Sequence, residues 1–247
     1  MSGWRRFSLA VLGFALLSAP AGADTVVADL SSHLIAITTG FTGATVVLFG
    51  AVDEPADVIA VVRGPDHDVT IWRKGKVLGI WANAEAVTFA NMPSFYAVGA
   101  SRPLESILSP SAAALYHIGL NNLKFTTKSD VAPDRLRLFI DGLVGVEQRA
   151  GVFSRTVGKI AFLGDRLFRT TITFPANVPT GTYLVEILLV RDKDVVGGQT
   201  TPLIVSKVGV DAAVFDFARN RSLAYGAIAV IMAVMAGWLA SLPFRHS

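Results

Sequence analysis

The feature that most constrains this chain is an apolar run near its C-terminus, Leu223 to Leu242, which contains no charged residue. As a helix its 20 residues would be roughly 30 Å long, which is the thickness of the hydrocarbon core of a bilayer. Tyr225 and Trp238 lie near the two ends, where amphipathic rings favour the headgroup region. We therefore predict a transmembrane helix over 223–242. The alternative, a buried helix of a soluble domain, is disfavoured because such helices rarely lack a polar face.

The N-terminus carries a second apolar run, Phe7 to Leu17, which follows two arginines. This run is too short to span a bilayer comfortably, and the small residues Ala21-Gly22-Ala23 after it form a typical cleavage site. We expect 1–23 to be a signal peptide, with an uncleaved N-terminal anchor as the alternative. The two ends together predict a single-pass type I membrane protein, with its main domain outside the cytoplasm and a short cytoplasmic tail, 243–247.

The composition supports a membrane protein and excludes several other classes. Hydrophobic residues make up 52% of the chain and charged residues 17%, whereas soluble domains carry about 25% charge. The lack of cysteine excludes a disulfide scaffold and a Cys-ligated zinc or iron–sulfur site. The net charge of +3 falls to +1 when the signal arginines are removed, so it gives no reason to expect a nucleic-acid partner.

The exported region is predicted to be mainly β at both of its ends. Short runs rich in β-branched and aromatic residues recur in 24–102 and 151–208, separated by Gly, Pro, Asp or Asn, which is typical of an antiparallel sandwich. The predicted strands are 34–39, 45–49, 57–63, 69–73, 77–81, 86–89, 95–98, 159–163, 166–174, 182–191 and 195–205. Lys74-Gly75-Lys76 is the predicted turn of one hairpin, and Asp192–Asp194 that of another.

The expected fold is an immunoglobulin-like β-sandwich with a helical insertion and one C-terminal transmembrane helix. The Pro-rich link 175–181, followed by Tyr183 in an alternating strand, is how such sandwiches commonly enter their last hairpin. Whether the strands form one sandwich or two is open at this point. We favour one composite unit because only about four strands follow residue 150. Residues 209–222 would form the juxtamembrane segment.

Residues 103–150 are predicted to be helical, because their apolar residues follow a helical spacing. The clearest stretch has an apolar stripe at Leu136, Phe139, Ile140 and Leu143. Pro133 suits its first turn, and Ser129 or Asp130 is the expected cap.

Several motifs occur together in an order that is specific to one family. They are Gly50, Arg63-Gly64-Pro65, Gly79-Ile80-Trp81, Pro93–Tyr96, Tyr116-His117-Ile118-Gly119, Pro175–Tyr183, Arg191-Asp192 and Phe215–Arg221. Over nearly the whole chain after the signal, the sequence resembles the alphaproteobacterial family of "putative transmembrane proteins" of unknown function. The resemblance implies a Gram-negative source, a periplasmic domain, an inner-membrane span and a permease encoded nearby. It supplies no catalytic or binding residue.

Two sets of side chains are candidates for a ligand site in the exported region. Arg63, Arg73 and Lys74 could bind an oxyanion, although we favour the alternative that they are charged residues of a solvated strand edge. Four aromatic residues, Trp72, Trp81, Phe95 and Tyr96, could line a ligand patch. We favour sandwich core and sheet-face packing for these four.

The sequence carries little sign of catalysis. Its three exported histidines, His33, His67 and His117, fall in separate segments, so they would bind a metal only if the fold brought them together. The chain has no Gly-x-Ser-x-Gly motif, P-loop or dinucleotide fingerprint. We therefore expect no catalytic residue, no metal and no cofactor.

The predicted span carries the clearest interaction signal. Ala229, Ala233, Gly237 and Ser241 recur every four residues and so share one helix face, which would let a second helix approach closely in lipid. A plain alanine-rich anchor is the alternative. The leading hypothesis is a membrane-anchored periplasmic accessory protein without enzymatic activity, with an integral membrane partner such as a permease. A periplasmic anion sensor is the alternative, and a metal-dependent hydrolase is the third.

Overall fold

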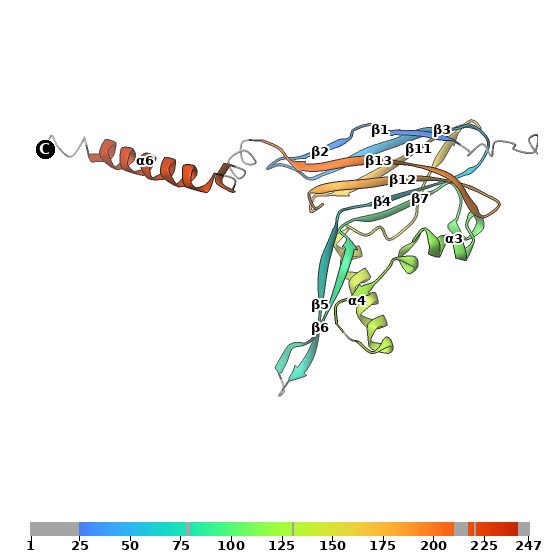
Figure 1. The fold of residues 1–247 in the computed structure, drawn as a ribbon, viewed down its shortest axis with the longest axis horizontal. Coiled ribbons are helices and arrows are strands. Elements are labelled where there is room, and N and C mark those ends of the chain that lie inside the picture. Colours follow the sequence, from blue (N-terminus) through green and yellow to red (C-terminus); the bar gives the residue numbers. More distant parts are fainter. Residues whose placement is uncertain (1–24, 78–79, 130, 210–216, 220, 242–247) are drawn as a thin grey trace, which may run out of the picture.

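The computed structural model describes residues 25–77, 80–129, 131–209, 217–219 and 221–241 (Figure 1). The predicted signal peptide, 1–23, and tail, 243–247, lie outside these residues, as does most of the juxtamembrane segment. The strands are β1 (Val26–Leu30), β2 (Leu34–Ile37), β3 (Gly43–Val52), β4 (Asp57–Arg63), β5 (Asp66–Val77), β6 (Ile80–Pro93), β7 (Tyr96–Ala100), β8 (Thr126–Thr127), β9 (Gly158–Lys159), β10 (Ala161–Leu163), β11 (Leu167–Pro175), β12 (Gly181–Arg191) and β13 (Asp194–Lys207). The helices are α2 (Leu104–Ile107), α3 (Pro110–Leu115), the 3-10 helix η1 (Leu120–Asn122), α4 (Pro133–Ala150) and α6 (Ser222–Ser241).

Two β-sheets form the main layers of the molecule (Figure 1). One has the order β1-β3-β11-β10 and is antiparallel throughout. The other has the order β2-β13-β12-β4-β7-β9, in which β2 runs parallel to β13 and β9 parallel to β7. Both sheets combine strands from the two predicted β regions, since β11 pairs with β3 and β12 pairs with β4. The two predicted β regions therefore share both of these sheets.

The core lies between these sheets, where alternate side chains of each strand point inward. Along β11 every second residue from Phe168 to Phe174 is buried, as the period of two in an extended strand requires. Phe174 stacks on Phe95 with ring centroids 4.9 Å apart, and its ring meets that of Tyr183 edge-on at 5.7 Å. At one margin Gln199 of β13 bonds both backbone groups of Ala28 in β1, which ties the sheets together.

The entry into the last hairpin is fixed by Tyr183. Its side chain is fully buried, and its hydroxyl donates to the carbonyl oxygen of Pro179 at 2.6 Å. Burial raises the pKa of this hydroxyl to about 12, so it stays protonated and able to donate. At the far end of β12, Asp192 and Lys193 both have positive φ, 52° and 69°. This geometry is that of a two-residue hairpin turn, as the sequence predicts.

A long hairpin, β5–β6, projects from the sandwich and forms a third sheet with β8 (Figure 1). The predicted turn at Lys74-Gly75-Lys76 is wrong, because β5 continues through it and Lys76 pairs with Trp81. The predicted strand 77–81 is wrong for the same reason, since it joins the end of one strand to the start of the next. Glycine at position 75 lets the two strands come close together, because an ideal Cβ there would lie only 2.8 Å from the Cβ of Ala84.

The helical segment covers one end of the sandwich and one side of the hairpin. Ser109 caps α3 by accepting a hydrogen bond from the amide of Ala112 at 3.2 Å. Pro133 begins α4 as predicted, but Ala132 holds the N-cap position, so neither Ser129 nor Asp130 does, and Asp130 lies outside the described residues. The predicted apolar stripe faces the core: Phe139 and Leu143 are buried.

The helix α6 nearly coincides with the predicted span 223–242, although residue 242 lies outside the described residues. Its described side chains, from Ser222 to Trp238, are all exposed. Within the described residues, no helix is found whose length and apolar character suffice to cross a membrane. The prediction that the exported region is mainly β is confirmed by the thirteen strands given above for the described residues. The transmembrane helix and the immunoglobulin-like character of the sandwich stay predictions.

Candidate functional site

A cleft of about 530 Å³ lies between the helical segment and the β7–β9 side of the second sheet. Volumes of roughly 300–1,000 Å³ are usual for ligand sites. Its apolar lining consists of Val98, Leu104, Leu108, Pro110, Ala113, Ile118, Leu120 and Val157. Its other lining residues are Tyr96, Glu105, Gly119, Asn121, Asn122, Ser154, Arg155 and Thr156. The cleft is therefore a mainly apolar surface with polar groups around it.

Tyr96 holds one wall of this cleft in place. Its hydroxyl donates to the carbonyl oxygen of His117 at 3.1 Å and accepts from the amide of Gly119 at 2.8 Å. Burial raises the pKa of this hydroxyl, which keeps its proton on the donating oxygen. His117 and Gly119 have φ of 52° and 89°, in the left-handed region where a non-glycine residue is strained. The two bonds from Tyr96 hold the loop in this conformation.

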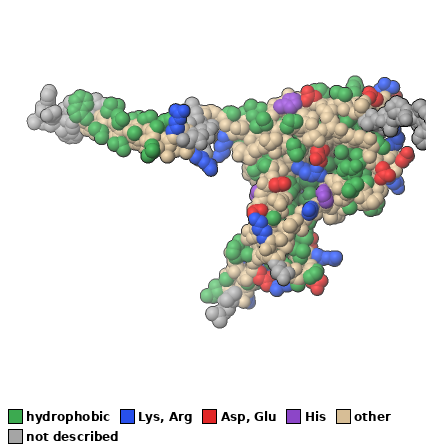
Figure 2. Space-filling model, in the orientation of Figure 1, with side chains coloured by type: hydrophobic (Ala, Val, Ile, Leu, Met, Phe, Trp, Pro, Cys, Tyr) green, Lys and Arg blue, Asp and Glu red, His purple; other side chains and the backbone are tan. Residues whose placement is uncertain are grey.

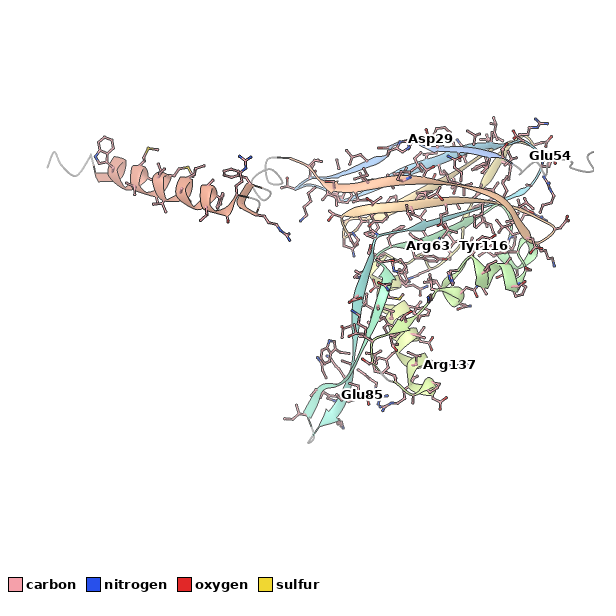
Figure 3. The ribbon with its side chains drawn as sticks, in the orientation of Figure 1. Asp29, Glu54, Arg63, Glu85, Tyr116 and Arg137 are labelled. Atoms are coloured by element: carbon pink, nitrogen blue, oxygen red, sulfur yellow. The ribbon has the colours of Figure 1, made fainter. Side chains whose placement is uncertain are left out.

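Arg63, the first predicted oxyanion ligand, lies under the same loop (Figure 3). Its guanidinium forms an ion pair with Glu186 of β12, which lies beside it in the sheet. The other terminal nitrogen, Nη2, donates to the carbonyl oxygen of Tyr116 at 2.9 Å. Both charged side chains are largely covered, with 21% and 28% of their surfaces exposed. In this arrangement Arg63 supports the cleft wall.

Arg73 and Lys74, the other two predicted ligands, lie far along the projecting hairpin. Arg73 follows Arg63 by ten positions of largely extended chain, which span up to roughly 30 Å. The Nε atom of Arg73 lies 3.9 Å from Glu85, and half of the Arg73 side chain is exposed. The structure therefore does not bring the three predicted ligands together.

The three candidate histidines are also separated. His33 follows β1 and its Nε2 lies 2.9 Å from Asp29. His67 is in β5, with Nδ1 3.0 Å from the carbonyl oxygen of Met92, and His117 is in the cleft wall, with Nδ1 3.0 Å from that of Asn122. Among the residues that the structure describes, no group of three or more His, Asp or Glu side chains is placed to hold a metal ion.

The four predicted aromatic residues divide into two pairs. Phe95 and Tyr96 are buried, with 2% and 1% of their surfaces exposed, so the core prediction is right for them. Trp72 and Trp81 are 56% and 66% exposed on the hairpin, so the core prediction is wrong for them. The four side chains do not form one patch.

The predicted helix-packing stripe lies on α6. Ala229, Ala233 and Gly237 follow one another at intervals of four residues, and the side chain of Ser241 lies outside the described part. An ideal Cβ at Gly237 would meet no atom within 4 Å, so the described chain leaves this face open.

One family model matches almost the entire chain. The family is Alph_Pro_TM, described as "Putative transmembrane protein", and its model matches residues 25–246. The chain belongs to this family. The resemblance stated from the sequence is therefore confirmed, and the family name is consistent with a membrane protein. No curated protein and no solved structure matches the chain.

Sequence reasoning missed the cleft as a site. Its walls come from three separated stretches, around 96–98, 104–122 and 154–157, and most of their side chains are apolar. Two of the motifs that carry the family resemblance, Pro93–Tyr96 and Tyr116–Gly119, meet here through the Tyr96 hydroxyl. The sequence shows that both motifs are present, but it does not show that they contact each other in the fold.

Proposed function

We propose that this chain is a membrane-anchored accessory protein without enzymatic activity, whose exported β domain binds a segment of an integral membrane partner. The cleft carries the proposal, since it combines an apolar lining with a wall that Tyr96 holds in one conformation. A wall fixed before binding lowers the entropic cost of binding. The partner class, an inner-membrane protein such as a permease, is what the family resemblance implies.

The polar groups of the cleft support a binding role. The Asn122 side chain donates to the carbonyl oxygen of Ile118 at 2.7 Å, and the Ser154 hydroxyl donates to that of Thr156 at 2.6 Å. Arg155 Nε donates to the carbonyl oxygen of Gln148 at 3.3 Å. These side chains hold the backbone of the cleft itself, which favours a shaped surface for recognition over groups poised for proton transfer.

We propose in addition that the domain is an immunoglobulin-like sandwich. Its antiparallel sheet corresponds to the strand order A-B-E-D of that fold, and β4, β12 and β13 correspond to strands C, F and G. The buried Tyr183, bonded to the backbone four residues upstream at the start of β12, matches the tyrosine corner of such sandwiches. The helical segment would then be an insertion that builds the cleft.

In this proposal α6 is the membrane anchor of a type I protein with its domain in the periplasm. Its 20 residues carry no charge, and its described apolar side chains are exposed. Exposure of so many large apolar side chains is unfavourable in water and favourable in lipid. The stripe Ala229, Ala233, Gly237 and Ser241 would then dock against a helix of the partner.

Site-specific photo-crosslinking in cells tests the binding role. We expect benzoylphenylalanine at Leu104 or Leu120, two lining positions, to form an adduct with the same membrane protein. The matched control is Thr171, on the exposed face of β11, which should form none. If the lining positions give no adduct, or all three give the same one, the cleft is not the binding site.

The same adduct measures the contribution of the stripe. Replacing Ala233 and Gly237 with leucine should reduce its yield if the stripe docks against the partner. An unchanged yield would leave α6 as a plain anchor.

A further inference from the structure

The end of the β5–β6 hairpin carries three large apolar side chains that are exposed. We call residues 72–76 and 80–84 the hairpin tip. Trp72, Ile80 and Trp81 in the tip are 56%, 71% and 66% exposed, and Figure 2 shows hydrophobic side chains at this end of the molecule. Among the described residues, α4 contacts β5 further back on the hairpin, near Ile71, which leaves these three side chains largely exposed.

The tip is also basic. Arg73, Lys74 and Lys76 lie in it, and its sequence contains no acidic residue. Among the described residues, neither Lys74 nor Lys76 forms an ion pair, and the ammonium of Lys76 lies 5.7 Å from the ring centre of Trp81. This cation–π contact places the positive charge and the indole on the same face of the hairpin.

The stem below the tip is braced. Glu85, which Figure 3 labels on the hairpin, forms an ion pair with Arg135 of α4. Lys128, beside β8, pairs with Asp68 of β5. β8 extends the sheet of the stem by pairing with β6. The tip is therefore presented on a stem that is held by several elements.

We propose that the hairpin tip inserts into the headgroup region of an anionic bilayer, with Ile80 and Trp81 among the upper acyl chains and Lys74 and Lys76 against the lipid phosphates. Tryptophan and basic side chains are the residues that favour the membrane–water interface, and clustered cations are attracted to anionic lipid. The chain belongs to a family of putative transmembrane proteins, so an anionic lipid surface would lie near the domain. This contact goes beyond the proposed function, since it involves neither the cleft nor α6.

The absence of cysteine makes the proposal testable by spin labelling of the full chain. A nitroxide would be attached to Ile80→Cys, and to Thr171→Cys as the matched control on an exposed strand of the sandwich. The labelled proteins would be reconstituted into vesicles of phosphatidylcholine alone or with 30% phosphatidylglycerol. Power saturation would then compare access of the label to oxygen and to a water-soluble nickel chelate.

We expect the ratio of oxygen to nickel access at position 80 to exceed that at position 171 severalfold in the phosphatidylglycerol vesicles. Adding Lys74→Gln and Lys76→Gln should lower the ratio at 80 while leaving the ratio at 171 and the circular dichroism unchanged. Equal ratios at the two positions in both vesicles would overturn the proposal. If the ratio at position 80 is high but changes neither with phosphatidylglycerol nor with the lysine substitutions, the tip does not recognise anionic lipid.

Discussion

Replacing Phe174 with alanine is expected to lower the free energy of unfolding by about 3–5 kcal/mol. The Phe174 side chain is fully buried between the sheets, in contact with the rings of Phe95 and Tyr183. Alanine would leave a cavity that two packed aromatic rings cannot easily fill. The loss is measured from the urea midpoint of the full chain in detergent, followed by circular dichroism in the far ultraviolet, where the strands dominate the change.

The matched control is Leu167→Ala on the same strand. Leu167 is 56% exposed, so its truncation should change the free energy of unfolding by less than about 0.5 kcal/mol. Equal losses for the two variants would mean that the two sheets do not enclose a common core at Phe174.

Replacing Arg63 with methionine is expected to cost about 1–3 kcal/mol of stability. Methionine keeps much of the apolar part of the Arg63 side chain but leaves the largely covered carboxylate of Glu186 without its partner. It also removes the donor to the carbonyl oxygen of Tyr116. The backbone amide of Gly119, in the adjoining cleft wall, should therefore exchange hydrogen faster, which mass spectrometry can follow.

A double-mutant cycle separates the ion pair from the loss of packing. Glu186→Gln removes the opposite charge, so adding it to Arg63→Met should cost less than the sum of the two single changes. Additive losses, with unchanged exchange at Gly119, would show that Arg63 does not support the cleft wall. Arg63 would then be available for the oxyanion role that its sequence position first suggests.

Much of the fold could be predicted from local patterns. The strand 57–63 matches β4 because a β-branched run bounded by turn residues allows few other structures. The helix that begins at Pro133 follows from its apolar stripe. The predicted turn at 74–76 is wrong because a glycine between two lysines has the same sequence signature in a turn as at a close cross-strand contact. Only the close approach of Gly75 to Ala84 distinguishes the two cases.

The site could not be predicted in the same way, because its residues are joined by tertiary contacts. The partner of Arg63 is set by the pairing of β4 with β12, which brings together residues 123 positions apart. The wall of the cleft depends on a tyrosine hydroxyl that reaches a loop 21 residues later. The two exposed tryptophans look like core residues in sequence, since hydrophobicity alone does not show that β5 and β6 leave the sandwich.

Whether α6 holds an exported β domain at the membrane is tested most directly by labelling two single-cysteine variants, Thr171→Cys and Ser247→Cys, with a membrane-impermeant maleimide. The cells would have a permeabilised outer membrane and an intact inner membrane. We predict that position 171 is labelled at once, that position 247 is labelled only after the inner membrane is lysed, and that the protein stays with the membranes after an alkaline carbonate wash. Labelling of 247 before lysis, protection of 171, or release of the protein by carbonate would contradict an exported domain anchored by α6.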